Sequence, residues 1–291
     1  MRLLIKHLCI LALGGLASAA FAQHPIDVEQ AAAHGEYLEA LTDYDRMPKR
    51  ISTTDATVAA AKSAWALSLP TRAITEFETA LQDKKLAPGV RTQILLSRGI
   101  IEYQEGRYQV SNLYAEKALV SCAVNCAERA KILLLWGEGL AQMGSNGAAE
   151  TKYLEALNNA TPEESPEIAF RLGVCRLRLG KTDDARASFE RVPLKNERTP
   201  DAIRYLATTS LEQAEYSNAS FWLKKGRAEY SDNFLDSWVD YALLQIAVHD
   251  RSKKDVREIR EAANKKYPPS DPWITLMNAS AEAFEWEEMH K

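Results

Sequence analysis

The chain has 291 residues, of which 40 are acidic and 36 are basic, giving a formal net charge of −4. This mildly acidic balance argues against general nucleic-acid binding, which requires a basic face, and four cysteines are too few for a disulfide-built scaffold. The length suits one or two globular domains or a single solenoid, whose core must come from helix packing.

The first 22 residues have the pattern of a secretory signal peptide. Arg2 and Lys6 give a positive start, residues 8–16 are apolar apart from two glycines, and a small-x-small pattern ends at Ala22. This apolar stretch is too short to span a bilayer, and no later segment approaches 18 consecutive apolar residues. We therefore expect cleavage near Ala22, export to the periplasm, and a mature chain without a transmembrane segment.

Five segments after residue 50 share one layout, and residues 23–48 carry a partial version of it. Each has a helix with a small residue in its middle, a short turn, and a second helix with a small residue followed by a large one four positions later. The copy with Gly173, Gly180, Ala185 and Phe189 shows the layout most clearly. The five copies cover about residues 54–87, 92–125, 130–163, 166–199 and 200–233.

The period of the layout follows from its mid-helix small residues. These are Ala61, Gly99, Gly137, Gly173 and Ala207, which lie 38, 38, 36 and 34 residues apart. Such a period indicates stacked helix–turn–helix repeats, in which a Gly or Ala lets two antiparallel helices approach closely. Large residues such as Phe77, Tyr153 and Phe189 are expected to fill the space between neighbouring units.

Glycines mark the turns of three copies. Gly106, Gly144 and Gly180 each stand where the first helix should end, so we expect them in the left-handed conformation that glycine adopts without steric cost.

The pattern weakens in residues 234–291. Two amphipathic stretches and the Pro268-Pro269 pair precede a last helix, which Ser270 or Asp271 should cap. We interpret this region as a degenerate repeat followed by a capping helix. Because no Ser/Gly-rich linker divides the chain, residues 23–291 are predicted to form one continuous solenoid.

The repeated small and aromatic residues resemble those of the tetratricopeptide repeat family. The resemblance implies an all-α fold, a right-handed α-α superhelix of about six to seven helix–turn–helix repeats. Some positions depart from the family pattern. Ser111 and Ala115 replace the usual alanine and aromatic residue, and Arg98 and Arg176 stand where apolar residues are common. We expect looser packing in the copy that contains Arg98.

Residues arranged for catalysis, for a cofactor or for a metal ion are not recognisable in the sequence. The mature histidines are scattered, and Gly137-Glu138-Gly139 lies inside a predicted helix, where it cannot act as a nucleotide-binding loop. An enzyme is therefore the least favoured class. Cys122 and Cys126 are expected to close a small disulfide after a helix end, the alternative being two half-buried thiols.

The resemblance further implies a ligand groove, because the first helix of each tetratricopeptide repeat lines the concave face. Projected onto this chain, the groove residues are Lys62, Trp65, Leu96, Ile100, Tyr103, Phe170, Val174, Arg178, Arg204 and Trp238. This lining is apolar and aromatic with occasional basic residues, which suits an amphipathic helix or an extended peptide. The family's two-carboxylate clamp is not matched. For any single residue, ordinary packing between helices is the competing interpretation.

These expectations together predict a non-enzymatic adaptor in the periplasm of a Gram-negative bacterium. Its partner would be a protein of an envelope assembly, such as a secretion, pilus, polysaccharide-export or cell-wall apparatus. The alternative is a module that binds a glycan during export or remodelling of an envelope polymer, for which aromatic faces and arginines would also be suited.

Overall fold

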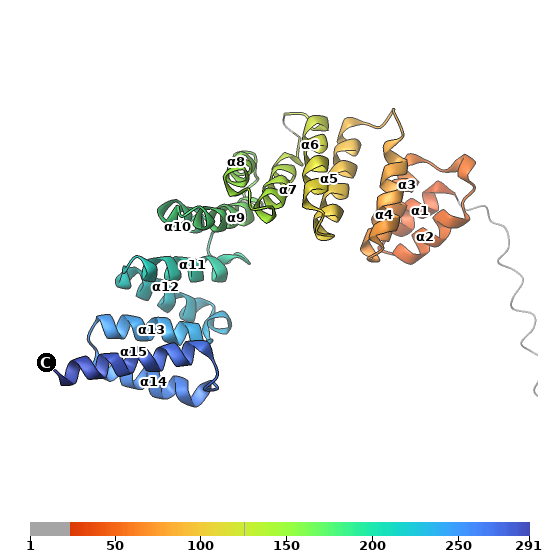
Figure 1. The fold of residues 1–291 in the computed structure, drawn as a ribbon. Coiled ribbons are helices and arrows are strands. Elements are labelled where there is room, and N and C mark those ends of the chain that lie inside the picture. The colour runs from red at the N-terminus through yellow and green to blue at the C-terminus, as the bar shows by residue number, and fades with distance from the viewer. Residues whose placement is uncertain (1–23, 125) are drawn as a thin grey trace, which may run out of the picture. The chain divides into compact units, whose positions relative to one another are not determined.

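The computed structural model describes residues 24–124 and 126–291, and the predicted signal peptide of residues 1–22 lies outside them. Over the described residues the chain forms fifteen α-helices and two short 3₁₀ helices, without a strand (Figure 1). The prediction of an all-α helical-repeat fold is thereby confirmed. No helix in this described part is both long and apolar enough to cross a membrane.

The chain divides into two compact units between Glu128 and Arg129. The first unit consists of three helix pairs joined by short turns (Figure 1). Its helices are α1 (Pro25–Ala33), α2 (Tyr37–Arg46), α3 (Thr54–Ala66), α4 (Pro70–Leu81), α5 (Pro88–Gln104) and α6 (Tyr108–Ser121), with a 3₁₀ helix at Lys49–Ile51. The segment expected to hold a partial repeat is therefore a short but complete pair, α1 with α2.

The second unit contains four helix pairs and a final single helix (Figure 1). Its helices are α7 (Arg129–Gln142), α8 (Asn146–Leu157), α9 (Ser165–Arg178), α10 (Thr182–Phe189), α11 (Thr199–Glu212), α12 (Tyr216–Glu229), α13 (Ser237–His249), α14 (Lys253–Lys266) and α15 (Pro272–Met289), with a 3₁₀ helix at Ser231–Phe234. The Asp271 side chain accepts a hydrogen bond from the Trp273 N–H and caps α15.

The turn inside every helix pair contains one residue with positive φ. Four of these residues are glycines, which confirms the predicted left-handed conformation of Gly106, Gly144 and Gly180. The other three turns use residues that carry a Cβ atom. The full set is Gly35, Ser68, Gly106, Gly144, Gly180, Ala214 and Arg251, with φ between 57° and 79°.

Replacing Ala214 with glycine should therefore stabilise the protein. An L-residue at φ 59° meets a steric penalty of about 1–2 kcal/mol, and glycine removes it at a smaller cost in chain entropy. We expect a net gain of about 0.5–1 kcal/mol, measured by urea unfolding. The matched control is Ala283→Gly inside α15, which should destabilise by about 1 kcal/mol. Equal effects at the two positions would contradict the conformational explanation.

The small residues of the first helices face aromatic rings of the second helices. A Cβ atom built on Gly173 would lie 2.6 Å from Phe189, and one on Gly137 would lie 2.7 Å from Tyr153. Phe189 also stacks on Tyr205 of the following pair, with ring centroids 4.9 Å apart. The predicted filling between units by Phe189 is confirmed, and the same ring closes the contact inside its own pair.

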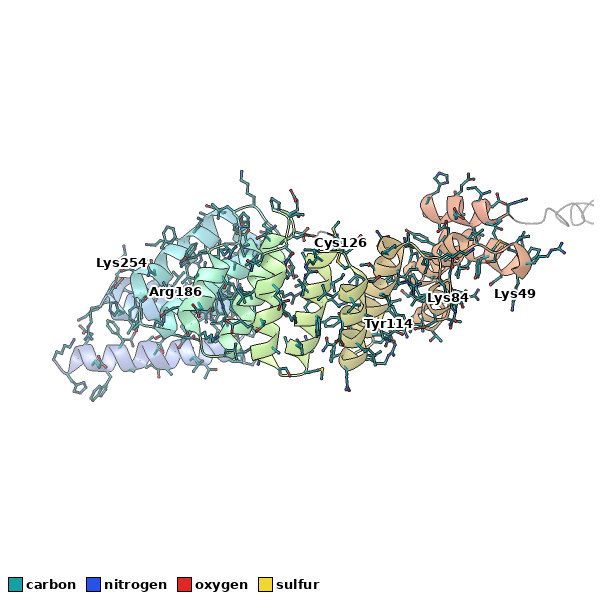
Figure 2. The ribbon with its side chains drawn as sticks, turned by 90° about the horizontal axis from the view of Figure 1, so that it is seen from above. Lys49, Lys84, Tyr114, Cys126, Arg186 and Lys254 are labelled. Atoms are coloured by element: carbon teal, nitrogen blue, oxygen red, sulfur yellow. A yellow bond between two sulfur atoms is a disulfide. The ribbon has the colours of Figure 1, made fainter. Side chains whose placement is uncertain are left out.

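Arg98 is only 7% exposed in α5. Its guanidinium forms ion pairs with Glu102 one turn later and with Glu78 of α4, 3.3 Å away. It also lies 4.7 Å from the centre of the ring of Tyr114, a residue labelled in Figure 2. Arg107 also pairs with Glu102. The sequence predicts looser packing in this repeat. The structure instead buries Arg98 and compensates its charge with ion pairs.

Arg176 follows the same principle in the second unit. Its Nε atom lies 3.1 Å from a Glu150 carboxylate oxygen of α8, and Lys181 lies 2.6 Å from the other oxygen. The hydrogen bond from Lys181, together with that from Arg176, lowers the pKa of Glu150 against the opposing effect of burial. Polar contacts therefore join successive helix pairs where the sequence departs from apolar residues.

Candidate functional site

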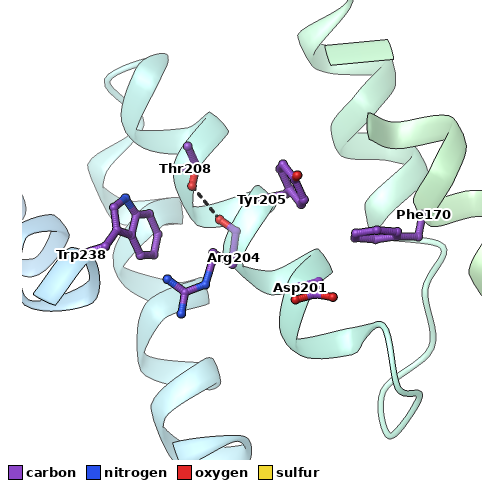
Figure 3. A pocket seen from close by; sticks show the side chains of 6 residues that line it. All are labelled: Phe170, Asp201, Arg204, Tyr205, Thr208 and Trp238. Carbon is purple, nitrogen blue, oxygen red and sulfur yellow. Dashed lines mark hydrogen bonds between the residues drawn. The ribbon is translucent and has the colours of Figure 1, made fainter. Parts of the chain in front are cut away.

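A pocket of about 440 Å³ opens in the second unit between α9, α11 and α13. These are the first helices of three successive pairs, so the pocket lies on the face where the groove is expected. Figure 3 shows the side chains that line it: Phe170, Asp201, Arg204, Tyr205, Thr208 and Trp238.

Aromatic rings form one wall of the pocket. The Phe170 ring centroid lies 5.8 Å from that of Tyr205 and 5.8 Å from that of Phe189. Because Phe189 in turn stacks on Tyr205, the three rings hold one another in place. Phe170 is only 6% exposed, so this wall of the pocket is the surface of a packed aromatic cluster.

Arg204 fixes the opposite side of the pocket. Its guanidinium donates to the Asp236 carboxylate at 2.5 and 3.3 Å and to the Asn233 carbonyl at 2.6 Å. Its central carbon also lies 4.8 Å from the centre of the Trp238 ring, which places Trp238 beside Arg204 in Figure 3. The arginine is thus engaged within the protein and covers one face of the indole.

A series of ion pairs connects the first helices on this face. Arg171 lies 3.2 Å from Glu138 and 2.7 Å from Glu167, and Arg198 donates to Glu167 at 3.0 Å. Burial raises the pKa of Glu138, against the charge of Arg171. Burial acts in the same direction on Glu167, but the hydrogen bond from Arg198 and the charge of Arg171 outweigh it, so the Glu167 pKa is lowered.

The pocket brings together three of the ten predicted groove residues, namely Phe170, Arg204 and Trp238. Val174 is half-buried and Arg178 exposed on α9, and neither lines the pocket. The other five belong to the first unit. There Lys62 is exposed, Leu96 is 7% exposed, and Trp65, Ile100 and Tyr103 are half-buried. The Trp65 indole donates to Gln104 at 3.1 Å, and Tyr103 packs against Tyr108. Burial makes packing the main role of Leu96.

Sequence reasoning missed Asp201 and Tyr205. Both were visible in principle, because Asp201, Arg204, Tyr205 and Thr208 follow the i, i+3, i+4, i+7 spacing of one helix face. The same spacing brings the neighbours of Arg204 one turn away on α11 to the face that Arg204 occupies.

Cys122 and Cys126 form a disulfide, with Cα atoms 5.7 Å apart (Figure 2). Helix α6 ends at Ser121 and Cys122 already has extended backbone angles, which lets the two side chains meet as they could not on a continuous helix. Cys175 is buried, and burial raises the pKa of its thiol. Within the described residues, no group of three or more His, Cys, Asp or Glu side chains could hold a metal ion.

Comparison with known families identifies the repeats. A model of the tetratricopeptide repeat matches residues 58–123 and 134–193. The chain is a tetratricopeptide-repeat protein. These repeats support a role as a scaffold for protein–protein interaction. In sequence, no curated protein matches this tetratricopeptide-repeat protein significantly.

Solved structures match the tetratricopeptide-repeat fold over most of the chain. The C-terminal part of a repeat protein from Cytophaga hutchinsonii is 13% identical, with a TM-score of 0.70 over 87% of this chain and 99% of that one. PilF from Pseudomonas aeruginosa is 17% identical, with a TM-score of 0.57 over 78% and 96%. A tetratricopeptide-repeat protein from Parabacteroides merdae is 14% identical, with a TM-score of 0.56 over 81% and 88%. At these identities the likeness concerns the fold alone.

Proposed function

We propose that this tetratricopeptide-repeat protein is a non-enzymatic adaptor of the bacterial periplasm, which holds a peptide or helix of an envelope assembly in the pocket between α9, α11 and α13. The observation that carries the proposal is the pocket itself. Side chains from three successive first helices converge on it, and it presents aromatic, apolar and charged groups to one occupant. Such a mixed lining is typical of a surface that anchors a protein segment.

The location rests on the sequence of the first 22 residues. A positive start, a short apolar stretch and a small-x-small site at Ala22 are the pattern that directs export. Fractionation of cells that produce the full chain should place it in the periplasm, with a mature N-terminus at Gln23. Retention of residues 1–22 in a cytoplasmic product would contradict this part of the proposal.

Glycan binding is the competing function, and the geometry of Trp238 makes it the weaker one. A sugar ring usually requires an open aromatic face for stacking, whereas Arg204 covers one face of this indole and Phe170 is almost fully buried. Retention of the protein on an envelope polysaccharide, without a protein partner, would instead favour the glycan alternative.

The test uses Trp238→Ala in the full chain. Trp238 is half-buried and lines the pocket from α13, so its loss should reduce capture of the partner at least tenfold, as expected for a central aromatic anchor. Capture is measured in living cells with a photo-crosslinking residue in place of Thr208, followed by mass spectrometry. The matched control is Trp286→Ala on α15, whose side chain is 60% exposed and does not line the pocket. Equal crosslinking in both variants would refute the assignment of the site.

A further inference from the structure

We propose that the pocket between α9, α11 and α13 binds an extended peptide segment that carries a basic side chain. The proposal rests on the adaptor function and names the chemistry of its partner. Three observations support it. The carboxylate of Asp201 is not neutralised by a close ion pair, the Tyr205 hydroxyl and the Trp238 indole N–H have no hydrogen-bond partner among the described residues, and Arg204 is already paired within the protein.

The surplus carboxylate belongs to Asp201. The pocket and the adjoining ion pairs contain the arginines Arg171, Arg198 and Arg204 and the carboxylates Glu138, Glu167, Asp201 and Asp236. Arg171 pairs with Glu138 and Glu167, Arg198 donates to Glu167, and Arg204 pairs with Asp236. Asp201 has only a 3.7 Å contact with Arg198, and its side chain is 54% exposed. One negative charge is therefore left over at the pocket, and a cation on the partner would neutralise it.

The two donors are the Tyr205 hydroxyl and the Trp238 indole N–H. Both residues line the pocket, and within the described part of the chain neither group has a hydrogen-bond partner or lies fully buried. They belong to different helices, α11 and α13. A ligand that spans the pocket can thus accept hydrogen bonds at two separate points.

Backbone carbonyls of an extended segment are well suited to these donors. A helix uses its carbonyl groups internally except in its last turn, whereas an extended chain advances about 3.3 Å per residue and leaves its carbonyls free. The aromatic wall at Phe170 and Tyr205 would receive an apolar side chain of the same segment.

The pairing of Arg204 argues against an acidic ligand. Asp236 and the Asn233 carbonyl already accept from its guanidinium, so a carboxylate on the partner would have to displace them and would approach Asp201 as well. A basic segment meets neither obstacle.

The experiment measures binding of three capped heptapeptides to the mature protein by fluorescence anisotropy. Each has phenylalanine at its centre, and the residue two positions later is lysine, glutamine or glutamate. The lysine peptide should bind about three- to fivefold more tightly than the glutamine peptide, as expected for a partly exposed ion pair, and the glutamate peptide should bind most weakly. A version with proline on both sides of the phenylalanine, which excludes a helix, should bind at least as well.

Three variants assign the contacts. Asp201→Asn should make the lysine and glutamine peptides bind equally. Tyr205→Phe and Trp238→Phe keep an aromatic ring but remove a donor, and each should weaken the lysine peptide about fivefold. A lysine preference that survives in Asp201→Asn, a preference for glutamate, or no binding by any peptide would overturn the proposal. If the natural partner is still captured in cells and lost in Trp238→Ala under any of those results, the adaptor function stands and only the basic, extended chemistry is wrong.

Discussion

Replacing Glu102 with leucine should destabilise the first unit by about 3 kcal/mol, the lower end of what loss of one partner of a buried ion pair costs. The Glu102 side chain is 3% exposed and pairs with both Arg98 and Arg107. Arg107 is 44% exposed and can turn to water when the carboxylate is removed. Arg98 is held inside the helix pair, where only the half-exposed Glu78 would remain to compensate its charge.

The size of this effect is best measured by urea unfolding of the full chain together with hydrogen exchange of the α5 and α6 amides. Lost protection should be concentrated in those two helices, because Arg98 and Glu102 both lie in α5 and Arg107, the other partner of Glu102, immediately precedes α6. The double variant Arg98→Met with Glu102→Leu is the control. Replacing both charges with apolar groups of similar size is often neutral, so most of the lost stability should return. If the double variant is as unstable as Glu102→Leu alone, the loss comes from packing rather than from an uncompensated charge.

Much of the fold could be predicted because the signals of a helix repeat are local. Gly137 and Gly173 must be small since the rings of Tyr153 and Phe189 lie against them, and that requirement recurs at a regular spacing in the sequence. The turns at Ser68, Ala214 and Arg251 have the same left-handed geometry as the glycine turns. The left-handed conformation at these three positions could not be predicted from the sequence, because serine, alanine and arginine rarely adopt a positive φ.

The environment of Arg98 was not predictable in the same way. The charge of Arg98 is compensated by Glu78, which lies 20 residues away in the sequence. Glu78 in turn accepts a hydrogen bond from Tyr114, 36 residues away from it. Pairing over such distances is set by how helix pairs stack. The prediction of one continuous solenoid across the boundary at Glu128 and Arg129 depends on the same kind of contact and stays a prediction.

For the candidate site, helix register was sufficient to find Phe170, Arg204 and Trp238. It did not show which of the predicted groove residues converge, and one of them, Leu96, is buried. Tyr205 is placed by its stacking on Phe189, and Asp201 matters because its neighbours are already paired. Both facts depend on tertiary contacts.

The second large effect is expected at Phe189, which is 1% exposed. Replacing it with alanine should destabilise the second unit by about 3–5 kcal/mol, the usual cost of emptying an aromatic site in a core. The ring covers Gly173 and stacks on Tyr205, so its loss opens the contact within one helix pair and the contact to the next. Urea unfolding measures the loss, and Phe189→Leu should cost less because it fills part of the space.

Gly173 provides the decisive control, because its substitution should change sign with the residue at position 189. In the wild-type chain, Gly173→Ala places a Cβ atom 2.6 Å from the Phe189 ring, and overpacking of this kind costs about 1–3 kcal/mol. In the Phe189→Ala background the ring is gone, so the same change should stabilise α9 by about 1 kcal/mol through helix propensity. A double-mutant cycle measures this coupling. If Gly173→Ala has the same effect in both backgrounds, then close approach of the ring is not the reason that glycine occupies this position, and the physical basis of the repeat pattern would have to be sought elsewhere.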